Sequence, residues 1–330
     1  ARRTDRFPAP PLVVSTDSFV VTPLEFKGGD IGKLAVCGTV NDVLMMGAIP
    51  KYLTCGFILE TGLEIARLDR IVASMAAEAR AAGVLIVAGD TKVIEGRTNA
   101  DRAGGSDVGG EGLMINSTGI GFLRAGTDIA RAPSAAKARP GDAVIVSGNL
   151  GDHHACILSA RMGVESDIES DCASLGETTD ALFRAGSEVH VLRDVTRGGL
   201  GAVLNEIADA SGVTIELSER ALPVDPKVAA FCGVMGLDPI YMGNEGKMVV
   251  FVPKVAAERA VALMRATEAG RGARVIGAVR ETEDADDPIG SPTDPPPAPR
   301  AARGFVVMRT KIGGARRIDT LFGEGLPRIC

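Results

Sequence analysis

Three aspartates stand where an apolar sequence would otherwise continue. Asp17 interrupts STDSF, Asp42 lies within the apolar run GGDIGKLAVCGTVNDVLMMGA, and Asp90 follows a glycine in AGDTK. A buried carboxylate is costly unless it is hydrogen-bonded, paired with a cation or bound to a metal. Oxygen ligands with few His or Cys nearby suit Mg²⁺ better than zinc, and Mg²⁺ in turn suggests phosphates. Each aspartate alone is also explained as a hydrogen-bonded structural residue, Asp90 above all as a turn cap.

Four glycine clusters follow strand-like or loop-like segments, at positions where backbone N–H groups can bind phosphate oxygens. Ordinary tight turns are the alternative for each cluster. GGDIGK has too few residues between its glycines for a P-loop and Leu34 where Ser or Thr should follow, and no GxGxxG motif opens a helix after a strand. If ATP binds, some other scaffold binds it. The clusters are GGD (28–30), SGNLGD (147–152), RGGLG (197–201) and NEGK (244–247).

The remaining candidates for chemistry are a lysine, a glutamate and a histidine pair. Lys92 follows Asp90 by two residues and therefore lies on the same side of an extended chain. Glu245 lies at a glycine turn before a strong strand, where a loop acid can serve as a base. His153 and His154 are too isolated for a His-rich metal site, and we expect them at a helix start near phosphate. A surface lysine and a solvated glutamate are the alternatives.

Apolar periodicity predicts the elements that must position these residues in the first half of the chain. Residues 28–48 are apolar nearly all round and predict a buried helix capped by Asp30 and ended by Gly47. Residues 63–83 predict a second helix that stops at Gly83. Strands are expected at 12–21, at 51–59, at 84–94 with a final Gly-Asp-Thr-Lys turn, and at 113–123, with a polar surface insertion at 95–112.

A change of domain is expected at 125–142, and a strand, glycine-turn and helix pattern restarts near Arg139. A helix is expected around 174–186, a strand with a long helix at 191–212, and strands at 243–252, 274–280 and 304–310. The Pro-rich segment 283–302 predicts a hairpin insertion, with a PxxP ligand for an SH3-type domain as the alternative. We therefore expect an α+β (mixed α/β) chain with domains at 1–125 and 139–310 and a flexible tail at 311–330.

Size and composition limit the classes of function. The 330 residues are 45 % hydrophobic and 4 % aromatic with 41 glycines, which fits a two-domain α/β enzyme. A net charge of −6 with both signs mixed argues against nucleic acid and membrane surfaces as partners. Without a membrane-spanning run, a secretory signal or a CxxC pair, we expect a cytoplasmic protein with reduced thiols. Because the sequence begins at Ala1, we expect that an N-terminal piece is missing.

The sequence ends on LPRIC, after a run with two glycine pairs and little to pack. Residues 311–330 would reach at most on the order of 70 Å when fully extended. Such a tether would let the thiol of Cys330 visit several proteins in turn, which a fixed cysteine could not do. An accidental cysteine at a frayed end is the alternative.

Motifs along the whole chain resemble the HypE family of hydrogenase maturation factors, within the superfamily of aminoimidazole ribonucleotide synthetases and selenophosphate synthetases. The terminal PRIC is the most specific of them. The chain departs from the family in lacking an N-terminal Gly-rich segment that covers the nucleotide, and in its two insertions. The other motifs are STDSFVVTPLEFKGGDIGKLAVCGTVNDVLMMGA, AGDTKV, NSTGIG, SGNLGDHH, RDVTRGGLGAVLNEIA and NEGK.

This resemblance implies a PurM-like fold whose N-terminal sheet domain forms a homodimer, with ATP and Mg²⁺ as cofactors. It also implies that the carbamoyltransferase HypF loads a carbamoyl group onto Cys330, and that ATP-dependent dehydration converts the thiocarboxamide to a thiocyanate. The cyano group would then pass to iron on the HypC–HypD complex, for [NiFe]-hydrogenase. Phosphorylation would turn the poorly leaving amide oxygen into a phosphate ester.

The resemblance implies the family's roles for the residues of this chain that match its motifs. Lys92 and Glu245 are the proton-handling candidates beside the carrier Cys330. Mg²⁺ would be held by Asp17, Asp42 and Asp90. The nucleotide-site candidates are Asp17, Asn41, Asp42, Asp90, Thr91, Gly148, Asp152, His153 and Asp194. The rival functions are a selenophosphate synthetase or an amide-activating ligase on the same scaffold, and a non-catalytic scaffold whose terminal cysteine forms a mixed disulfide or binds a metal.

Overall fold

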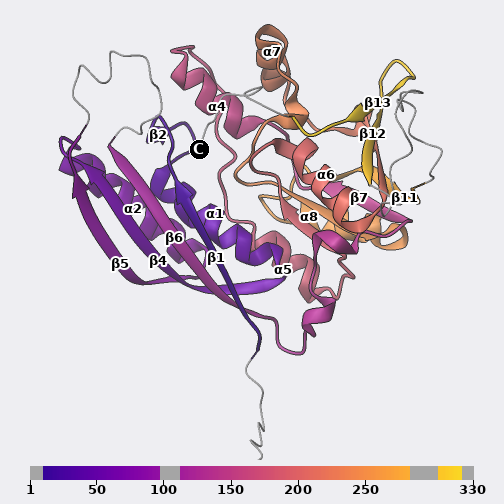
Figure 1. Ribbon diagram of the computed structural model, residues 1–330, viewed down its shortest axis with the longest axis horizontal. Helices are drawn as coiled ribbons and strands as arrows, with labels where there is room; N and C mark the ends of the chain where they lie inside the picture. The colour runs from indigo at the N-terminus through magenta and orange to yellow at the C-terminus, as the bar shows by residue number, and fades with distance from the viewer. Residues whose placement is uncertain (1–9, 97–111, 283–303, 322–330) are drawn as a thin grey trace, which may run out of the picture. The chain divides into compact units, whose positions relative to one another are not determined.

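The structure is a computed structural model that describes residues 10–96, 112–282 and 304–321 (Figure 1). The chain divides into two compact units. The N-terminal unit consists of Ala1–Leu24 and Asp30–Ala132, and the C-terminal unit of Glu25–Gly29 and Pro133–Cys330. Each unit has its own sheet, so the expected mixed α/β chain of two sheet-containing parts is confirmed. Predictions for the N-terminal end, for most of 95–112, for 283–302 and for Cys330 fall outside the described residues.

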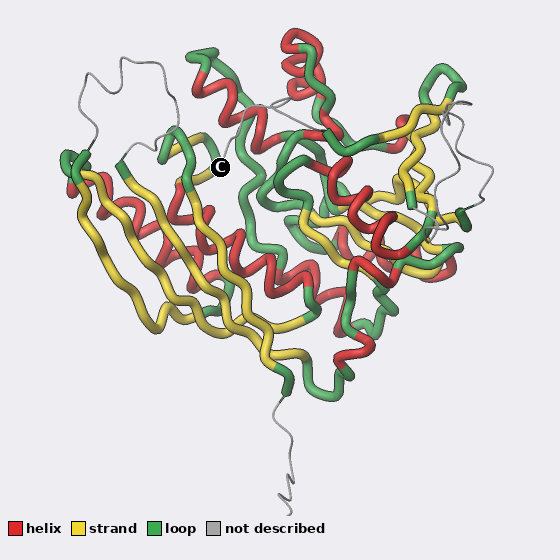
Figure 2. Tube along the Cα trace, viewed as in Figure 1, coloured by secondary structure: helices red, strands yellow, loops and turns green. Residues whose placement is uncertain are grey.

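A four-stranded sheet with helices on one face forms the N-terminal unit (Figures 1 and 2). The strand order is β1-β6-β4-β5, antiparallel except for the parallel β4–β5 pair. Every second residue of β6 is buried, as expected for a sheet covered on one face. The elements are β1 (Leu12–Phe19), α1 (Ile31–Met45), β4 (Ala48–Glu60), α2 (Ile65–Ala81), β5 (Leu85–Ile94) and β6 (Leu113–Leu123).

Helix α1 confirms the predicted buried helix and its cap. The Asp30 carboxylate accepts hydrogen bonds from the backbone N–H groups of Gly32 at 2.7 Å and Lys33 at 2.9 Å. The helix then lies close against the sheet because β6 presents glycine to it. A Cβ atom at Gly121 would come 2.5 Å from Cγ1 of Val43 on α1. The close helix–sheet contact therefore depends on the missing side chain of Gly121.

Strand β5 corrects one prediction. The expected Gly-Asp-Thr-Lys turn does not form, because β5 continues through Asp90 and Lys92 to Ile94. These residues pair with β4, Asp90 opposite Gly56 and Lys92 opposite Ile58. Gly89 lies where the two strands approach closely, since a Cβ there would be 2.9 Å from the carbonyl oxygen of Cys55. The parallel neighbour outweighs the local turn signal, and the turn-cap alternative for Asp90 is wrong.

A seven-stranded sheet forms the core of the C-terminal unit, in the order β13-β12-β9-β11-β7-β10-β8. Its strands are β7 (Asp142–Val146), β8 (Val191–Asp194), β9 (Thr214–Ser218), β10 (Met248–Pro253), β11 (Arg274–Arg280), β12 (Phe305–Arg309) and β13 (Ala315–Ile318). Its helices are α4 (Asp152–Arg161), α5 (Gly176–Arg184), α6 (Gly199–Ser211), α7 (Pro226–Met235) and α8 (Ala257–Arg265). Short pieces are the ribbon of β2 (Glu25–Phe26) and β3 (Gly29–Asp30) and the 3₁₀ turns Ile129–Arg131, Ala135–Lys137, Glu219–Ala221, Pro239–Tyr241 and Lys254–Ala256.

Both faces of the interior strand β7 are covered. Val144 and Val146 belong to the hydrophobic cluster that Leu204 and Ile207 of α6 also join. Ile145 points to the opposite face and is also fully buried, and on that side α8 contacts β7, β10 and β11. Because both faces are covered, the whole of β7 is buried, as sheets between two helix layers require.

The start of the expected flexible tail is also corrected. Residues 315–318 form β13, which pairs antiparallel with β12 from Val306 opposite Ile318 to Arg309 opposite Ala315. The glycine pair at 313–314 makes the hairpin turn between them, with Gly313 at φ +93° and the Thr310 N–H donating to the carbonyl of Gly314 at 2.8 Å. Two adjacent glycines thus act as a turn and not as part of a tether.

Among the described residues, no helix is long and apolar enough to cross a membrane.

Replacing Gly121 with alanine is expected to destabilise the N-terminal unit by about 1–3 kcal/mol, because the new methyl group forces α1 away from the sheet. Gly56 of β4 is a matched control, since a Cβ there meets nothing nearer than 3.9 Å. Urea unfolding of both variants measures the free energies of unfolding. Equal stability of the two variants would contradict the close packing of α1 on β6.

Candidate functional site

Asp17 and Asp42 lie on the helix-covered side of the N-terminal sheet. Asp17 is opposite Ser117 of β6, and Ser117 contacts α1 through a hydrogen bond from its hydroxyl to the carbonyl of Ala35. Asp42, half-buried on α1, accepts a 2.6 Å hydrogen bond from the hydroxyl of Ser15, two residues before Asp17 on β1. Residues two apart on a strand share a face, so both carboxylates belong to the face that α1 covers.

Asn41, the neighbour of Asp42 on α1, is buried with only 3 % of its surface exposed.

Asp90 and Lys92 lie on the opposite face of the same sheet. A row of paired residues runs across the four strands, from Ser18 of β1 through Asn116 and Gly56 to Asp90. Because this row is one residue out of step with that of Asp17, its side chains project from the other face. Asn116 Nδ2 donates to the Ser18 hydroxyl at 2.9 Å.

An ion pair holds Lys92 beside Asp90, as their spacing predicted. Lys92 Nζ is 2.5 Å from Oδ2 of Asp90. The hydrogen bond from Lys92 is the main reason why the pKa of the Asp90 carboxyl is lowered, and the backbone N–H of Thr91, which donates to it at 2.9 Å, adds to the effect. All three residues are exposed, on a strand that is exposed along its whole length.

One chain therefore does not bring the three aspartates together, because the sheet lies between Asp90 and the pair formed by Asp17 and Asp42. Within residues 10–96, 112–282 and 304–321, no group of three or more His, Cys, Asp or Glu side chains could hold a metal ion. The assignment of all three as Mg²⁺ ligands stays a prediction, and a single chain does not fit it.

In the C-terminal unit, Asn244 connects three loops. Its side-chain oxygen accepts the backbone N–H of Gly151 at 2.7 Å, just before α4. Its side-chain nitrogen donates to the carbonyls of Val195 at 3.0 Å and Met242 at 3.1 Å. Asn244 is fully buried, so each of these bonds is protected from water. The loop that carries Glu245 is thereby tied to the start of α4, where Asp152 lies.

Next to this connection lies a buried ion pair. Lys247 Nζ is 3.1 Å from Oδ2 of Asp171, and the two side chains are 12 % and 3 % exposed. Burial alone would raise the pKa of Asp171, but the Lys247 ammonium and the backbone N–H of Glu245, which donates at 3.0 Å, lower it. Glu245 itself is only 7 % exposed, so the alternative of a solvated glutamate is wrong.

Glycines make room for this ion pair. A Cβ at Gly148 would lie 2.8 Å from Cε of Lys247, and a Cβ at Gly246 would lie 1.9 Å from the carbonyl oxygen of Asp171. The glycines of SGNLGD and NEGK therefore have a packing reason, namely the close passage of the lysine stem and of the backbone.

Burial changes the pKa values of Asp152 and of the histidine pair. Burial, followed by the negative charge of Asp171, raises the pKa of Asp152 to about 6, although Lys247 works in the opposite direction. Burial lowers the pKa values of His153 and His154 to about 4. His153 Nδ1 is 2.7 Å from the hydroxyl of Ser170. Two neutral, buried imidazoles supply no positive charge for a phosphate, so the expected position beside phosphate finds no support here.

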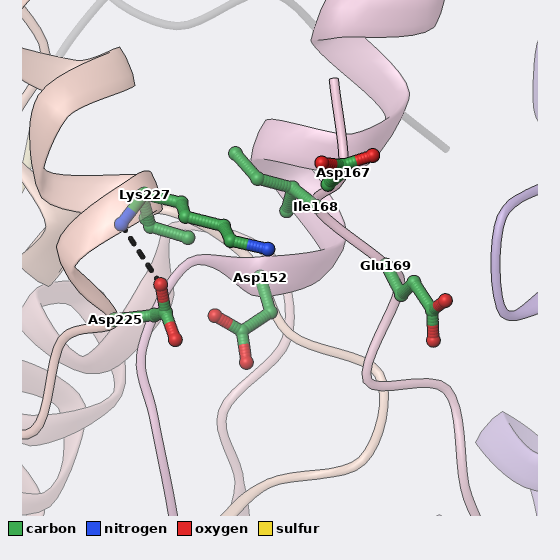
Figure 3. Close-up of a pocket in the computed structure, with 7 residues that line it drawn as sticks. Asp152, Asp167, Ile168, Glu169, Asp225 and Lys227 are labelled. Carbon is green, nitrogen blue, oxygen red and sulfur yellow. Dashed lines mark hydrogen bonds between the residues drawn. The ribbon is translucent and has the colours of Figure 1, made fainter.

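A cavity of about 350 Å³ opens beside Asp152 (Figure 3). The side chains of Asp152, Asp225 and Lys227 face the same space. Asp225 caps α7 by accepting the backbone N–H of Lys227 at 2.8 Å. The lining has four carboxylates and one ammonium, so its charge does not suit a polyphosphate by itself. The lining residues are Asp152, Asp167, Ile168, Glu169, Asp225, Lys227 and Val228.

Asp194, the last candidate, is half-buried at the end of β8, opposite Met248 of β10.

Comparison with known proteins identifies the family. Residues 8–123 match the family "AIR synthase related protein, N-terminal domain", and residues 139–286 match "AIR synthase related protein, C-terminal domain". The chain is 48 % identical to the carbamoyl dehydratase HypE of Rhodobacter capsulatus, over 100 % of this chain and 88 % of that protein. This chain belongs to the HypE family. The resemblance in its motifs is thereby confirmed, as is the PurM-like two-domain fold.

Solved HypE structures agree with this assignment. The chain is similar to a crystal structure of the hydrogenase maturation protein HypE in complex with ATP, with 46 % identity and a TM-score of 0.84 over 97 % of this chain and 87 % of that one. It is also similar to a chain in a crystal structure of a HypE–HypF complex, with 42 % identity and a TM-score of 0.80 over 94 % and 90 % of the two chains.

Four residues of this HypE-family chain escaped the sequence reasoning. Asn116 and Lys247 lie within the motifs NSTGIG and NEGK, where a polar residue inside a strand or directly before one was an available signal. Asn244 also lies in NEGK, but two of its three hydrogen-bond partners, Gly151 and Val195, are far away in sequence. Asp171 lies in ESDIESDCAS among other acids, and nothing in that pattern distinguishes the one that faces Lys247.

The Lys247→Met variant is expected to lose roughly 3–5 kcal/mol of unfolding free energy, because it leaves the Asp171 charge buried without its partner. Adding Asp171→Asn should restore most of that loss by removing the unpaired charge. Lys254→Met, at an exposed lysine, is the control and should stay near wild type. Urea unfolding measures all four chains, and a double variant no more stable than Lys247→Met would contradict the charge argument.

Asp152 should make stability depend on pH. Its folded-state pKa of about 6 lies above the ordinary value of 3.8, so the unfolded chain releases its proton first and stability falls as pH rises from about 4 to 6. The full shift corresponds to roughly 3 kcal/mol, and partial exposure reduces it to about 1–2 kcal/mol. The unfolding free energy of Asp152→Asn should therefore rise by this amount relative to that of wild type as the pH increases across that interval.

Urea unfolding at several pH values measures this gain, with Asp209→Asn at an exposed position on α6 as the control. A difference between Asp152→Asn and wild type that stays constant with pH would overturn the assignment.

Proposed function

We propose that this chain is an ATP-dependent carbamoyl dehydratase that converts S-carbamoyl Cys330 to S-cyano Cys330, with release of ADP and phosphate. The observation that carries the proposal is the 46 % identity and TM-score of 0.84, over 97 % of this chain, to a HypE that binds ATP. Relatives named carbamoyl dehydratase HypE extend over the whole chain. A selenophosphate synthetase or another amide-activating ligase would not be expected to show this relationship.

The chemistry must remove one oxygen and two protons from a carbamoyl group. Attack of the carbamoyl oxygen on the γ-phosphate of ATP forms an imidate phosphate ester and ADP, and the nitrogen loses one proton. Loss of phosphate with the second N–H proton then leaves the thiocyanate. Phosphorylation makes the oxygen a good leaving group, and a base must accept the protons. Mg²⁺, where it binds, would neutralise phosphate charge.

Glu245 and Lys92 remain the proton-handling candidates. A carboxylate can accept a proton directly, whereas an ammonium must first lose one. Glu245 is nearly buried in a loop held by Asn244 and by the Lys247–Asp171 ion pair, so it is well positioned as the base. Lys92 is exposed on β5 and paired with Asp90, a setting that suits contact with phosphate oxygens.

The properties of the described cysteines make them poor carriers, which supports Cys330 in that role. Cys37, Cys55, Cys156, Cys172 and Cys232 are all buried. Burial raises the pKa of Cys55 and of Cys232 to about 11. Because the thiolate is the nucleophile, such thiols are poor acceptors of a carbamoyl group.

We further propose a cytoplasmic homodimer that binds HypF and the HypC–HypD complex. The solved HypE–HypF complex supports HypF as a partner. Strand β5 supports the dimer, because it is an edge strand with exposed apolar side chains, among them Leu85 at 64 % and Val93 at 64 %. An apolar edge strand left open would favour association with another chain. A second chain could also complete the set formed by Asp17, Asp42 and Asp90.

The test separates loading from dehydration. The chain is loaded with HypF, carbamoyl phosphate and ATP, freed of HypF and nucleotide, and then given Mg-ATP or a non-hydrolysable ATP analogue. Intact and peptide mass spectrometry follows the Cys330 peptide. A carbamoyl group that loses the mass of one water only with ATP supports the proposal. A chain that loads but never loses water, or that never loads, contradicts the dehydratase assignment and favours a non-catalytic scaffold.

Two variants test the carrier thiol and the base separately. Cys330→Ser should not load, because it lacks the thiol. Glu245→Gln should load normally but lose water roughly 10²–10⁴-fold more slowly, since it lacks the base. Glu258→Gln, at an exposed glutamate in the first turn of α8, is the matched control and should match wild type. Normal water loss by Glu245→Gln would move the base role to Lys92 or elsewhere.

A further inference from the structure

Strand β13 is attached more firmly than its length requires. It has four residues and lies at the edge of the seven-stranded sheet, where β12 is its one partner among the described strands. A strand so short at an edge is weakly held by its backbone bonds alone. Ile318, its last residue, is nevertheless 0 % exposed and belongs to the core cluster built around α6.

Helix α6 holds the end of the strand. Asn205 Nδ2 donates to the backbone carbonyl of Ile318 at 2.9 Å and to that of Gly201 at 2.8 Å. A Cβ at Gly201 would lie 2.5 Å from the ring of Tyr241 and 3.4 Å from Cγ2 of Ile318. The small residue thus lets Tyr241 and Ile318 close on the helix, and one amide fixes the backbone where β13 ends.

Charged contacts secure the rest of the hairpin. Arg316 Nη2 is 2.5 Å from Oδ2 of Asp238, and the Arg317 guanidinium lies 5.4 Å from the ring centre of Phe305. At the turn, Glu219 accepts the backbone N–H of Lys311 at 2.7 Å. Single exposed contacts of this kind contribute little, but here they join the hairpin to several separate elements of the unit.

We infer that β13 anchors the carrier arm, with Asn205 as a positioning residue that acts through Ile318. This inference rests on the proposed role of Cys330. Twelve residues follow Ile318 up to and including Cys330, and fully extended they span at most about 40 Å, whereas about 70 Å was expected from residue 311. The arm that presents the carbamoyl group therefore starts at a fixed point of the C-terminal unit.

Shortening an arm raises the local concentration of its thiol, roughly as the inverse 3/2 power of its length. An arm of 12 residues instead of 20 would give about a twofold gain.

Hydrogen exchange of the full-length chain tests the attachment. Backbone amides of 315–318 should exchange at least about 10-fold faster in Asn205→Ala than in wild type, while the rest of the sheet keeps its protection. Asp209→Ala, at an exposed position on the same helix, should leave the pattern unchanged. Exchange of 315–318 that is as fast in wild type as in an unstructured peptide would overturn the anchor.

Two insertions of equal length test its role in the reaction. Twelve Gly and Ser residues placed between Gly313 and Gly314 lengthen the chain before the anchor, and the same residues between Asp319 and Thr320 lengthen it after. Only the second should slow water loss from the loaded chain, by about threefold. Equal slowing by both insertions would place the start of the arm before β13, and no slowing by either would remove the positioning role.

Failure of the proposed function can be distinguished from failure of the β13 attachment. A wild-type chain that loads and never loses water contradicts the dehydratase assignment and the positioning role together. In that case the exchange pattern still decides whether β13 is held by Asn205.

Discussion

The ion pair of Lys247 with Asp171 brings two opposite charges into a place that water scarcely reaches. Either charge alone would be costly there, so the surrounding loops must keep the two groups together. Glycine makes this possible, because Gly148 leaves space for the lysine stem and Gly246 lets the backbone approach Asp171. The backbone N–H of Glu245 completes the surroundings of Asp171. The position of the proposed base is therefore a consequence of how the chain buries this ion pair.

The same charges set the character of the neighbouring cavity. Burial, and after it the negative charge of Asp171, raises the pKa of Asp152, and the Lys247 ammonium offsets only part of this effect. The cavity beside it is lined mainly by acids. In the N-terminal unit the setting is the reverse, since Lys92 and Asp90 lie on an open sheet face in water. We therefore propose phosphate contact for the exposed Lys92 and not for the acidic cavity, and proton transfer for the enclosed Glu245 and not for Lys92.

Local sequence signals predicted the elements whose stability is local. Helix α1 was predictable from Asp30 and its apolar run, because a cap and a buried helix need only neighbouring residues. The turn expected at Asp90 failed because pairing with β4, where Gly56 is opposite Asp90, outweighs it. The flexible tail expected from residue 311 failed for the same reason, since β12 and α6 hold the last strand. Lys92 beside Asp90 follows from spacing, whereas Asp171 beside Lys247 depends on tertiary contacts that no short motif records.

Cysteine chemistry and the anchored arm answer two different demands of a carrier. Selective loading needs one reactive thiol, and the five described cysteines meet that need by being buried. Repeated transfer needs a thiol that can leave one partner and reach another, yet remain close enough to react at its own chain. A long arm helps the thiol to reach its partners but hinders the reaction at its own chain, because the local concentration of the thiol falls as the arm lengthens. Fixing the chain at Ile318 shortens the arm, although the cysteine keeps its position in the sequence. The hairpin thus removes eight residues from the expected tether and places the start of the arm at Ile318.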